Sequence, residues 1–133
     1  MENIAGGGKA VNDWALKMGY TMKPARKMGN TSNAIDMCKF WNDVCRNKFE
    51  GAENIFKISS SCQTSSSRSK KCMPKDVYIG GKTGSYSNVN HDCCYIEKDG
   101  RFYSICVLTE LGSKGSEAIA QMFRGLYNEY INK

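Results

Sequence analysis

The spacing of the apolar residues changes at Asp76, and this change limits the folds that the chain can adopt. Before Asp76, apolar side chains recur every three or four residues, which is the helical period. After it, β-branched and aromatic residues gather in short runs that are typical of strands. This order predicts an α+β fold in which an antiparallel sheet of three C-terminal strands has helices packed on it.

Two helices are expected before the change in spacing. The first spans residues 9–18, and Gly19 follows it as a stop signal. The second begins after Thr31 and Ser32, which are good N-cap residues. Each helix has one apolar face, formed by Ala10, Val11, Trp14, Ala15 and Met18 in the first and by Ala34, Met37, Cys38, Trp41, Val44 and Cys45 in the second.

The second half of the chain predicts strands and a closing helix. The strands are expected at residues 77–83, 92–96 and 102–109. Asp99-Gly100 is a hairpin signal, so the second and third strands should be antiparallel neighbours. Residues 116–131 should form a helix that lies on the sheet through one apolar stripe, made of Ile119, Met122, Phe123, Leu126, Tyr127 and Tyr130.

Length and composition predict one domain or part of one. The chain has 133 residues and an ordinary globular composition. A helical part is expected at 1–58 and a part with strands and a helix at 76–133. Residues 59–75, rich in Ser and Lys and without periodicity, should form the loop between them. No apolar run approaches the roughly 18 residues that a membrane span needs.

The charge and the histidine count exclude some partners. The net charge is +6, but only residues 68–75 form a basic patch, and no aromatic residues are interleaved with it. This pattern disfavours nucleic acid as a partner. Because the chain has a single histidine, His91, and no Cys-x-x-Cys pair, neither a metal nor another cofactor is expected.

Seven cysteines leave at least one thiol outside any internal pairing. Cys38, Cys45 and Cys106 fall at apolar positions of expected elements and should behave as small buried hydrophobic residues. This pattern favours a reducing compartment. Cys62 and Cys72 flank the Ser-rich loop and would form a disulfide if the chain were exported. The sequence therefore does not decide between a reducing and an oxidising compartment.

Adjacent residues on one strand must point to opposite faces of the sheet. Cys93 and Cys94 are such a pair, so their side chains should lie on different faces. Redox chemistry between these two cysteines is accordingly a minor hypothesis.

The segment Lys82-Thr83-Gly84-Ser85 combines a cation, a hydroxyl and a bare glycine on an expected strand. Such groups can form one wall of an anion-binding site, because the ammonium and the hydroxyl both donate hydrogen bonds. The same residues could instead form a polar turn between strands.

The segments around this motif resemble the C-terminal half of the class A β-lactamase and penicillin-binding protein superfamily. In that family a Lys-Thr-Gly strand comes first, and a second strand that begins with a His-Asp segment follows it. An Asp-Gly hairpin, an apolar strand and a terminal helix come next. Residues 75–85, 89–96 and 99–109 reproduce this series, and residues 31–40 resemble the helix start that precedes it. The resemblance covers residues 9–133 and implies an incomplete β-lactamase or transpeptidase-like domain.

The resemblance implies acyl transfer from a β-lactam or a D-Ala-D-Ala-type peptide to a serine. Lys82 and Thr83 would bind the substrate carboxylate, and Gly84 would leave the strand edge open to the substrate backbone. The backbone N–H of Ser85 would be one oxyanion-hole donor. His91, by the same resemblance, is a structural residue and no catalytic partner of Asp92.

Other parts of the chain depart from the family pattern. The nucleophilic serine and its lysine base lie upstream of every matching residue in that family. A Ser-x-x-Lys motif is therefore expected nowhere in these 133 residues, and the chain alone is expected to be inactive. Asn3 faintly echoes the asparagine of the family's Ser-x-Asn loop, although the serine is absent. Residues 22–30 stand where class A enzymes carry a deacylating glutamate, but they contain none.

Two hypotheses follow. The chain is the C-terminal portion of a serine hydrolase, which a missing N-terminal segment or another chain completes. Alternatively it is a catalytically dead scaffold, an interaction subunit of a larger assembly whose exposed sheet edge is covered by another protein.

Overall fold

The sheet has three antiparallel strands in the order β1-β2-β3 in the computed structural model, which describes residues 6–25, 31–62 and 64–133. The strands are β1 (Tyr78–Tyr86), β2 (Val89–Lys98) and β3 (Arg101–Thr109). Asp99 and Gly100 both have positive φ, as the tight hairpin between β2 and β3 requires. The expected α+β class and the antiparallel pairing of the last two strands are therefore confirmed.

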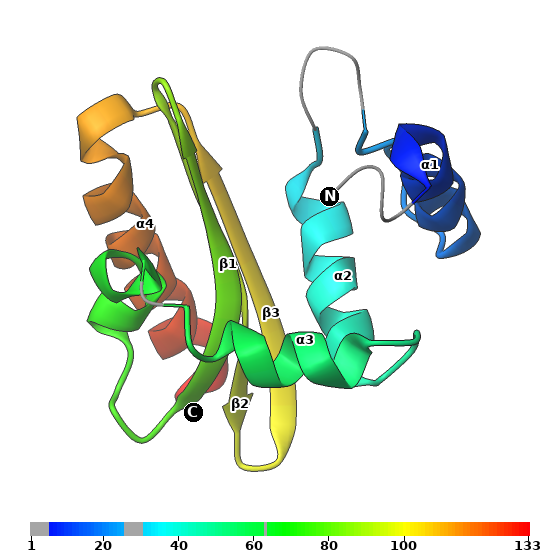
Figure 1. Cartoon of the computed structure of the whole chain (residues 1–133). Coiled ribbons are helices and arrows are strands. Elements are labelled where there is room, and N and C mark those ends of the chain that lie inside the picture. The colour runs from blue at the N-terminus through cyan, green and yellow to red at the C-terminus, as the bar shows by residue number, and fades with distance from the viewer. Residues whose placement is uncertain (1–5, 26–30, 63) are drawn as a thin grey trace.

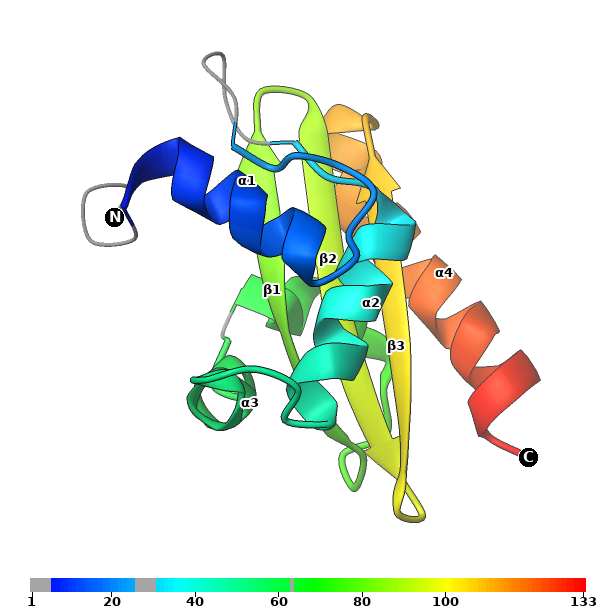
Figure 2. The same ribbon diagram turned by 90° about the vertical axis from the view of Figure 1, so that its right-hand side faces the viewer.

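Helices cover both faces of this sheet (Figure 1). The helices are α1 (Gly7–Lys17), α2 (Ala34–Cys45), α3 (Ala52–Ser59) and α4 (Gly115–Leu126), and a π-helical turn (Tyr127–Ile131) extends α4. Helix α4 lies on one face, while α2 and α3 lie on the other with α1 outside α2 (Figure 2). None of the helices in the described parts of the chain is long and apolar enough to cross a membrane.

Short 3₁₀ helices occupy part of the segment that was expected to be a loop. They are η1 (Thr64–Ser67) and η2 (Ser69–Cys72), and a third, η3 (Gly112–Lys114), precedes α4.

Helix α3 was not predicted from the sequence. It is held to the sheet by the buried Tyr95, whose hydroxyl donates to the carbonyl of Phe56 at 2.8 Å and whose ring stacks on the Phe56 ring.

The two faces of the sheet build two separate apolar clusters, because side chains alternate along each strand. Cys94 belongs to the cluster under α4, and Cys93 to the cluster under α2, as expected for adjacent residues. The stripe of the last helix differs from the prediction. Residues four apart, Ile119, Phe123, Tyr127 and Ile131, are buried, whereas Met122 and Tyr130 flank this row and are exposed.

Helix α2 begins differently from the prediction. Its N-cap is Asn33, not Thr31 or Ser32, and the Asn33 side chain accepts a hydrogen bond from the backbone N–H of Asp36 at 2.8 Å. The buried Asp36 carboxylate in turn accepts from the backbone N–H groups of Thr21 and Met22 and from the Thr21 hydroxyl. Burial opposes ionisation of Asp36, but these hydrogen bonds outweigh it and lower its pKa. The carboxylate thus fastens the segment after α1 to α2.

We expect Asp36→Ala to lower the free energy of unfolding by about 1 to 3 kcal/mol, because it leaves the backbone N–H groups of Thr21 and Met22 without their acceptor. Asp36→Asn, which keeps one oxygen, should cost less. Since the folded pKa of Asp36 is lowered, its contribution is present at neutral pH and is lost as pH falls through that pKa. Urea titrations should show that the difference in free energy of unfolding between wild type and Asp36→Asn becomes smaller from pH 7 to pH 3. A difference that does not change with pH would contradict this role of Asp36.

Candidate functional site

The motif Lys82-Thr83-Gly84-Ser85 lies within β1, at an edge of the sheet. Among the described residues no further strand pairs with β1, so its outer side is an unpaired sheet edge, along which the Lys82 ammonium donates to the backbone carbonyl of Thr83. Lys82 and Ser85 are exposed, whereas Thr83 is buried. By strand alternation Thr83 and Ser85 lie on the face that α4 covers, and Lys82 lies on the other. The structure therefore does not bring Lys82 and the Thr83 hydroxyl to one face.

Three glycines of β1 have different surroundings. A Cβ on Gly80 would lie 2.4 Å from the Tyr95 hydroxyl, and one on Gly81 would lie 2.5 Å from the backbone carbonyl oxygen of Cys93. Both glycines are required by close packing. A Cβ on Gly84 would meet only the His91 side chain, at 3.8 Å. Gly84 thus keeps the strand surface bare without being needed for the fold.

Arg68 belongs to this candidate site, although its place in the sequence predicts only a loop residue. It was assigned to a solvated loop, but it is only 7% exposed and its guanidinium lies beneath the end of β1. It donates to the carbonyl oxygens of Gly84 at 3.1 Å and His91 at 2.7 Å, and to the Ser85 hydroxyl. No local pattern could reveal this role, because these partners lie 16 to 23 residues further along the chain.

Two further contacts tie Arg68 to the ends of neighbouring elements. It donates to Asn90 Oδ1 at 3.0 Å and to the hydroxyl of Ser116, in the first turn of α4, at 3.2 Å. Asn90 also accepts from the Ser85 hydroxyl at 3.2 Å and donates to the carbonyl of Gly112 at 2.6 Å. Ser85, Asn90 and Arg68 therefore form one hydrogen-bonded group that carries a positive charge behind the motif.

The buried Asp92 carboxylate lies next to this group on β2. Burial raises its pKa, and hydrogen bonds from Ser69 together with the nearby charges of Arg68 and Lys70 oppose that shift. Its Oδ2 atom accepts from the backbone N–H of Ser69 at 3.0 Å, which anchors η2 on the sheet. Asp92 is thus in a position to balance part of the Arg68 charge.

His91 has a structural contact, as the sequence analysis expected. Its Nδ1 atom accepts a hydrogen bond from the backbone N–H of Thr109 at 3.3 Å, across the β2–β3 pair. Its neighbour Asp92 contacts η2 instead, so the two side chains do not form a catalytic dyad.

The expectation that the sequence lacks a Ser-x-x-Lys spacing was wrong, because Ser67-Arg68-Ser69-Lys70 has it. This tetrapeptide spans the end of η1 and the start of η2, so it does not lie on one α-helix. The ammonium of Lys70 donates to the carbonyl oxygens of Ser60 at 2.6 Å and Cys62 at 3.1 Å. Lys70 therefore holds the segment that follows α3.

Other candidate positions add nothing to this site. Asn3 lies outside the described residues. Within the described ranges, no cluster of three or more His, Cys, Asp or Glu side chains could hold a metal ion.

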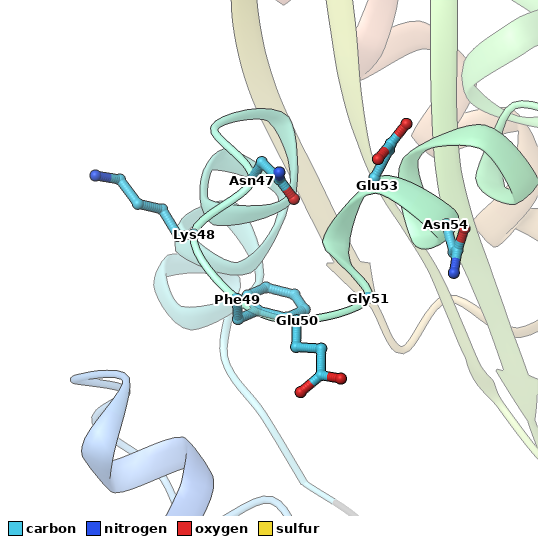
Figure 3. A pocket seen from close by; sticks show the side chains of 7 residues that line it. All are labelled: Asn47, Lys48, Phe49, Glu50, Gly51, Glu53 and Asn54. Atoms are coloured by element: carbon cyan, nitrogen blue, oxygen red, sulfur yellow. The ribbon is translucent and has the colours of Figure 1, made fainter.

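A pocket of about 490 Å³ lies between α2 and α3, far along the chain from the motif (Figure 3). Its polar side chains point in different directions and do not converge on one point, as seen for Lys48, Glu50 and Glu53.

Comparison with known proteins supplies independent information. The sequence model of the protein family described as Beta-lactamase enzyme family matches residues 3–130. No curated protein matches the sequence.

Solved structures match almost the whole chain. A β-lactamase from Sphaerobacter thermophilus is 23% identical, with a TM-score of 0.78, over 92% of this chain and 53% of that one. A variant of PBP-A in its acyl-enzyme complex with penicillin G is 18% identical, with a TM-score of 0.78, over 96% and 53%. An ancestral class A β-lactamase is 17% identical, with a TM-score of 0.83, over 96% and 57%. The chain shares their fold and spans about half of their length.

The two glycines Gly81 and Gly84 provide a matched pair of variants. Gly81→Ala should lower the free energy of unfolding by about 1 to 3 kcal/mol, because the added Cβ meets the backbone of β2 and must push the strands apart. Gly84→Ala should leave stability unchanged within about 0.5 kcal/mol. Urea unfolding of both variants measures the difference. Equal losses would contradict the packing described for β1.

Arg68→Ala should destabilise the chain by about 1.5 to 3 kcal/mol, because it removes charge-assisted hydrogen bonds to two strands and to α4. Arg68→Lys should restore only a small part of this loss, because an ammonium cannot reproduce the fork of the guanidinium. Thermal unfolding of the three proteins checks the order, and full recovery by lysine would contradict it.

Proposed function

Because the chain belongs to the Beta-lactamase enzyme family, we propose that it is the substrate-binding, C-terminal portion of a serine hydrolase of the β-lactamase or penicillin-binding type. The observation that carries the proposal is the motif Lys82-Thr83-Gly84-Ser85 on the open edge of β1, with the Arg68 guanidinium behind it. Residues 1–133 are then a single partial domain, in which residues 59–75 connect the helical part to the sheet and supply Arg68.

The substrate class in this proposal is a β-lactam or a D-Ala-D-Ala-type peptide. Both carry a carboxylate, which the exposed ammonium of Lys82 attracts from the open side of β1. Arg68 adds positive charge behind Ser85, so the end of the strand favours an anion. PBP-A, whose acyl-enzyme with penicillin G has a similar fold, supports this choice of ligand.

The reaction in this proposal is acyl transfer to a serine that the described part of the site does not supply. Gly84 leaves room for the substrate backbone to lie along β1. The backbone N–H of Ser85 donates to the developing oxyanion, a role for which one donor is typically worth about 3 to 4 kcal/mol. The Arg68 contacts to Gly84 and Ser85 fix that N–H before substrate binds. Lys82 also lowers the proton affinity of neighbouring groups.

The nucleophile is assigned to the half of the fold that this chain does not span. The literal Ser67-x-x-Lys70 spacing does not fill the role, because the Lys70 ammonium is engaged by two backbone carbonyls after α3. The completing half comes from an N-terminal segment or from another chain. The chain alone is accordingly inactive.

A fluorescent penicillin tests this assignment. We expect covalent labelling when the chain is joined to, or mixed with, an N-terminal segment that carries a Ser-x-x-Lys helix, and none with the chain alone. In the completed protein, Lys82→Ala should slow labelling about tenfold to a hundredfold, because one charge-assisted contact is lost. Lys75→Ala, at an exposed lysine that precedes β1, is the matched control and should have no effect.

Two results would contradict the proposal. One is the absence of labelling in a completed protein that unfolds cooperatively. The other is labelling of the chain alone that Ser67→Ala abolishes, since this would place the nucleophile within the Ser67-x-x-Lys70 spacing.

The outer edge of β3 favours a second candidate function, that of a catalytically dead scaffold or interaction subunit. No strand of the described residues pairs with this edge, and the side chains of Phe102 and Leu108 on β3 are exposed. A covering protein would then bind along β3. Light scattering should show that the isolated chain self-associates through this uncovered edge, whereas a stable monomer with cooperative unfolding would contradict this alternative.

A further inference from the structure

Three cysteines from three different elements meet on the face of the sheet that α2 covers. Cys93 on β2 lies opposite Cys106 on β3 in the antiparallel register, and both contribute to the cluster under α2. Cys38 reaches them from α2, which lies over β3 in Figure 2, and its thiol donates to the carbonyl of Ser104 at 3.7 Å. All three are free thiols. The apolar phase of the sequence predicts small buried hydrophobic residues at Cys38 and Cys106, but both are only half-buried.

Hydrogen bonds make the three thiols unequal. The neighbouring Cys106 thiol lowers the pKa of Cys38 to about 7 and outweighs the opposing effect of burial. The pKa of Cys106 itself is raised, because the Cys38 and Cys93 thiols lie next to it and because it is buried. Cys38 therefore carries more thiolate at neutral pH than Cys106, which is its protonated neighbour.

A pocket gives solvent access to two of these thiols. It has a volume of about 350 Å³, and Cys38, Ser104 and Cys106 form part of its wall, along β3. Cys93 does not line this pocket and is only 3% exposed. A small molecule can thus reach Cys38 and Cys106, whereas Cys93 lies behind them.

We propose that Cys38 and Cys106 form a reversible oxidation site that takes a small hydroperoxide and links α2 to β3 by a disulfide. The Cys38 thiolate attacks the peroxide, so that an S–O bond forms, the O–O bond breaks, and the leaving oxygen takes up a proton. The Cys106 sulfur then attacks the sulfenic sulfur of Cys38. The S–S bond forms, the S–O bond breaks, and the hydroxyl leaves as water with the Cys106 proton. In total, two thiols and one hydrogen peroxide give one disulfide and two waters.

The arrangement explains why Cys106 resolves the intermediate. Its raised pKa comes first from the hydrogen bond to Cys38. Once Cys38 is a sulfenic acid, its sulfur no longer accepts the proton as a thiolate, and this cause disappears. The disulfide would then hold the helical layer on β3, independently of any chemistry at the β1 motif.

The test is mass spectrometry of the chain after treatment with equimolar hydrogen peroxide at pH 7. We expect two thiols per chain to be lost, peptide mapping without reductant to find Cys38 joined to Cys106, and dithiothreitol to restore both thiols. In Cys106→Ser the reaction should stop at the sulfenic acid of Cys38, which dimedone traps. Cys45→Ser is the matched control on the same helix, because burial raises the pKa of Cys45 to about 12, and it should leave the disulfide yield unchanged.

Other outcomes would overturn the proposal. A Cys93–Cys106 disulfide with Cys38 still reduced would show that the cross-strand pair reacts instead. Oxidation spread evenly over all seven cysteines would show that the site has no special reactivity. Because mapping is done on the wild-type chain, the result stands even if a serine variant fails to fold.

Discussion

The hydrogen bonds of the buried Arg68 guanidinium are the interaction on which the rest of the site depends. Arg68 comes from the irregular segment between the helical part and the sheet, yet it joins β1, β2 and the first turn of α4. A guanidinium suits this position because its fixed fork of donors can satisfy several oxygens at once. The same contacts place a positive charge behind Ser85.

The sheet between the helical layers explains how one motif can be both rigid and accessible. The central strand β2 is paired on both sides, and its residues from Asp92 to Ile96 are buried between α4 and α2. Gly80 and Gly81 allow β1 to pack closely against this strand. The outer side of β1 remains open, so a ligand meets a backbone that is already fixed. The cluster of three cysteines, Cys38, Cys93 and Cys106, lies toward the other edge of the sheet, at β2 and β3.

The sequence predicted those features whose causes are local. The Asp99-Gly100 turn and the alternation of Cys93 and Cys94 depend on near neighbours, and both are found as expected. The motif on β1 was located by its residue types, because a cation and glycines on a strand are visible in the sequence.

Features that depend on distant partners could not be predicted in this way. The role of Arg68 requires oxygens on strands that follow it, and α3 is held by Tyr95, which lies 39 residues after Phe56. The apolar phase placed Cys38 and Cys106 on inward faces but could not show that they line one pocket. The Ser67-x-x-Lys70 spacing is the opposite case, in which the sequence motif is present but the helical geometry is absent. Its residues are divided between two short 3₁₀ helices and do not lie on one α-helix.

The most direct test of the central claim is an NMR titration of the ¹⁵N-labelled chain with penicillin G, followed at the backbone amides of β1 and at the Arg68 side chain. Binding of the carboxylate at β1 should give saturable shifts at Lys82, Gly84, Ser85 and Arg68 Nε, which are lost in Lys82→Ala and kept in Lys75→Ala. Shifts confined to the pocket around Asn47 and Asn54, or none at β1, would contradict the assignment of the carboxylate site to this strand.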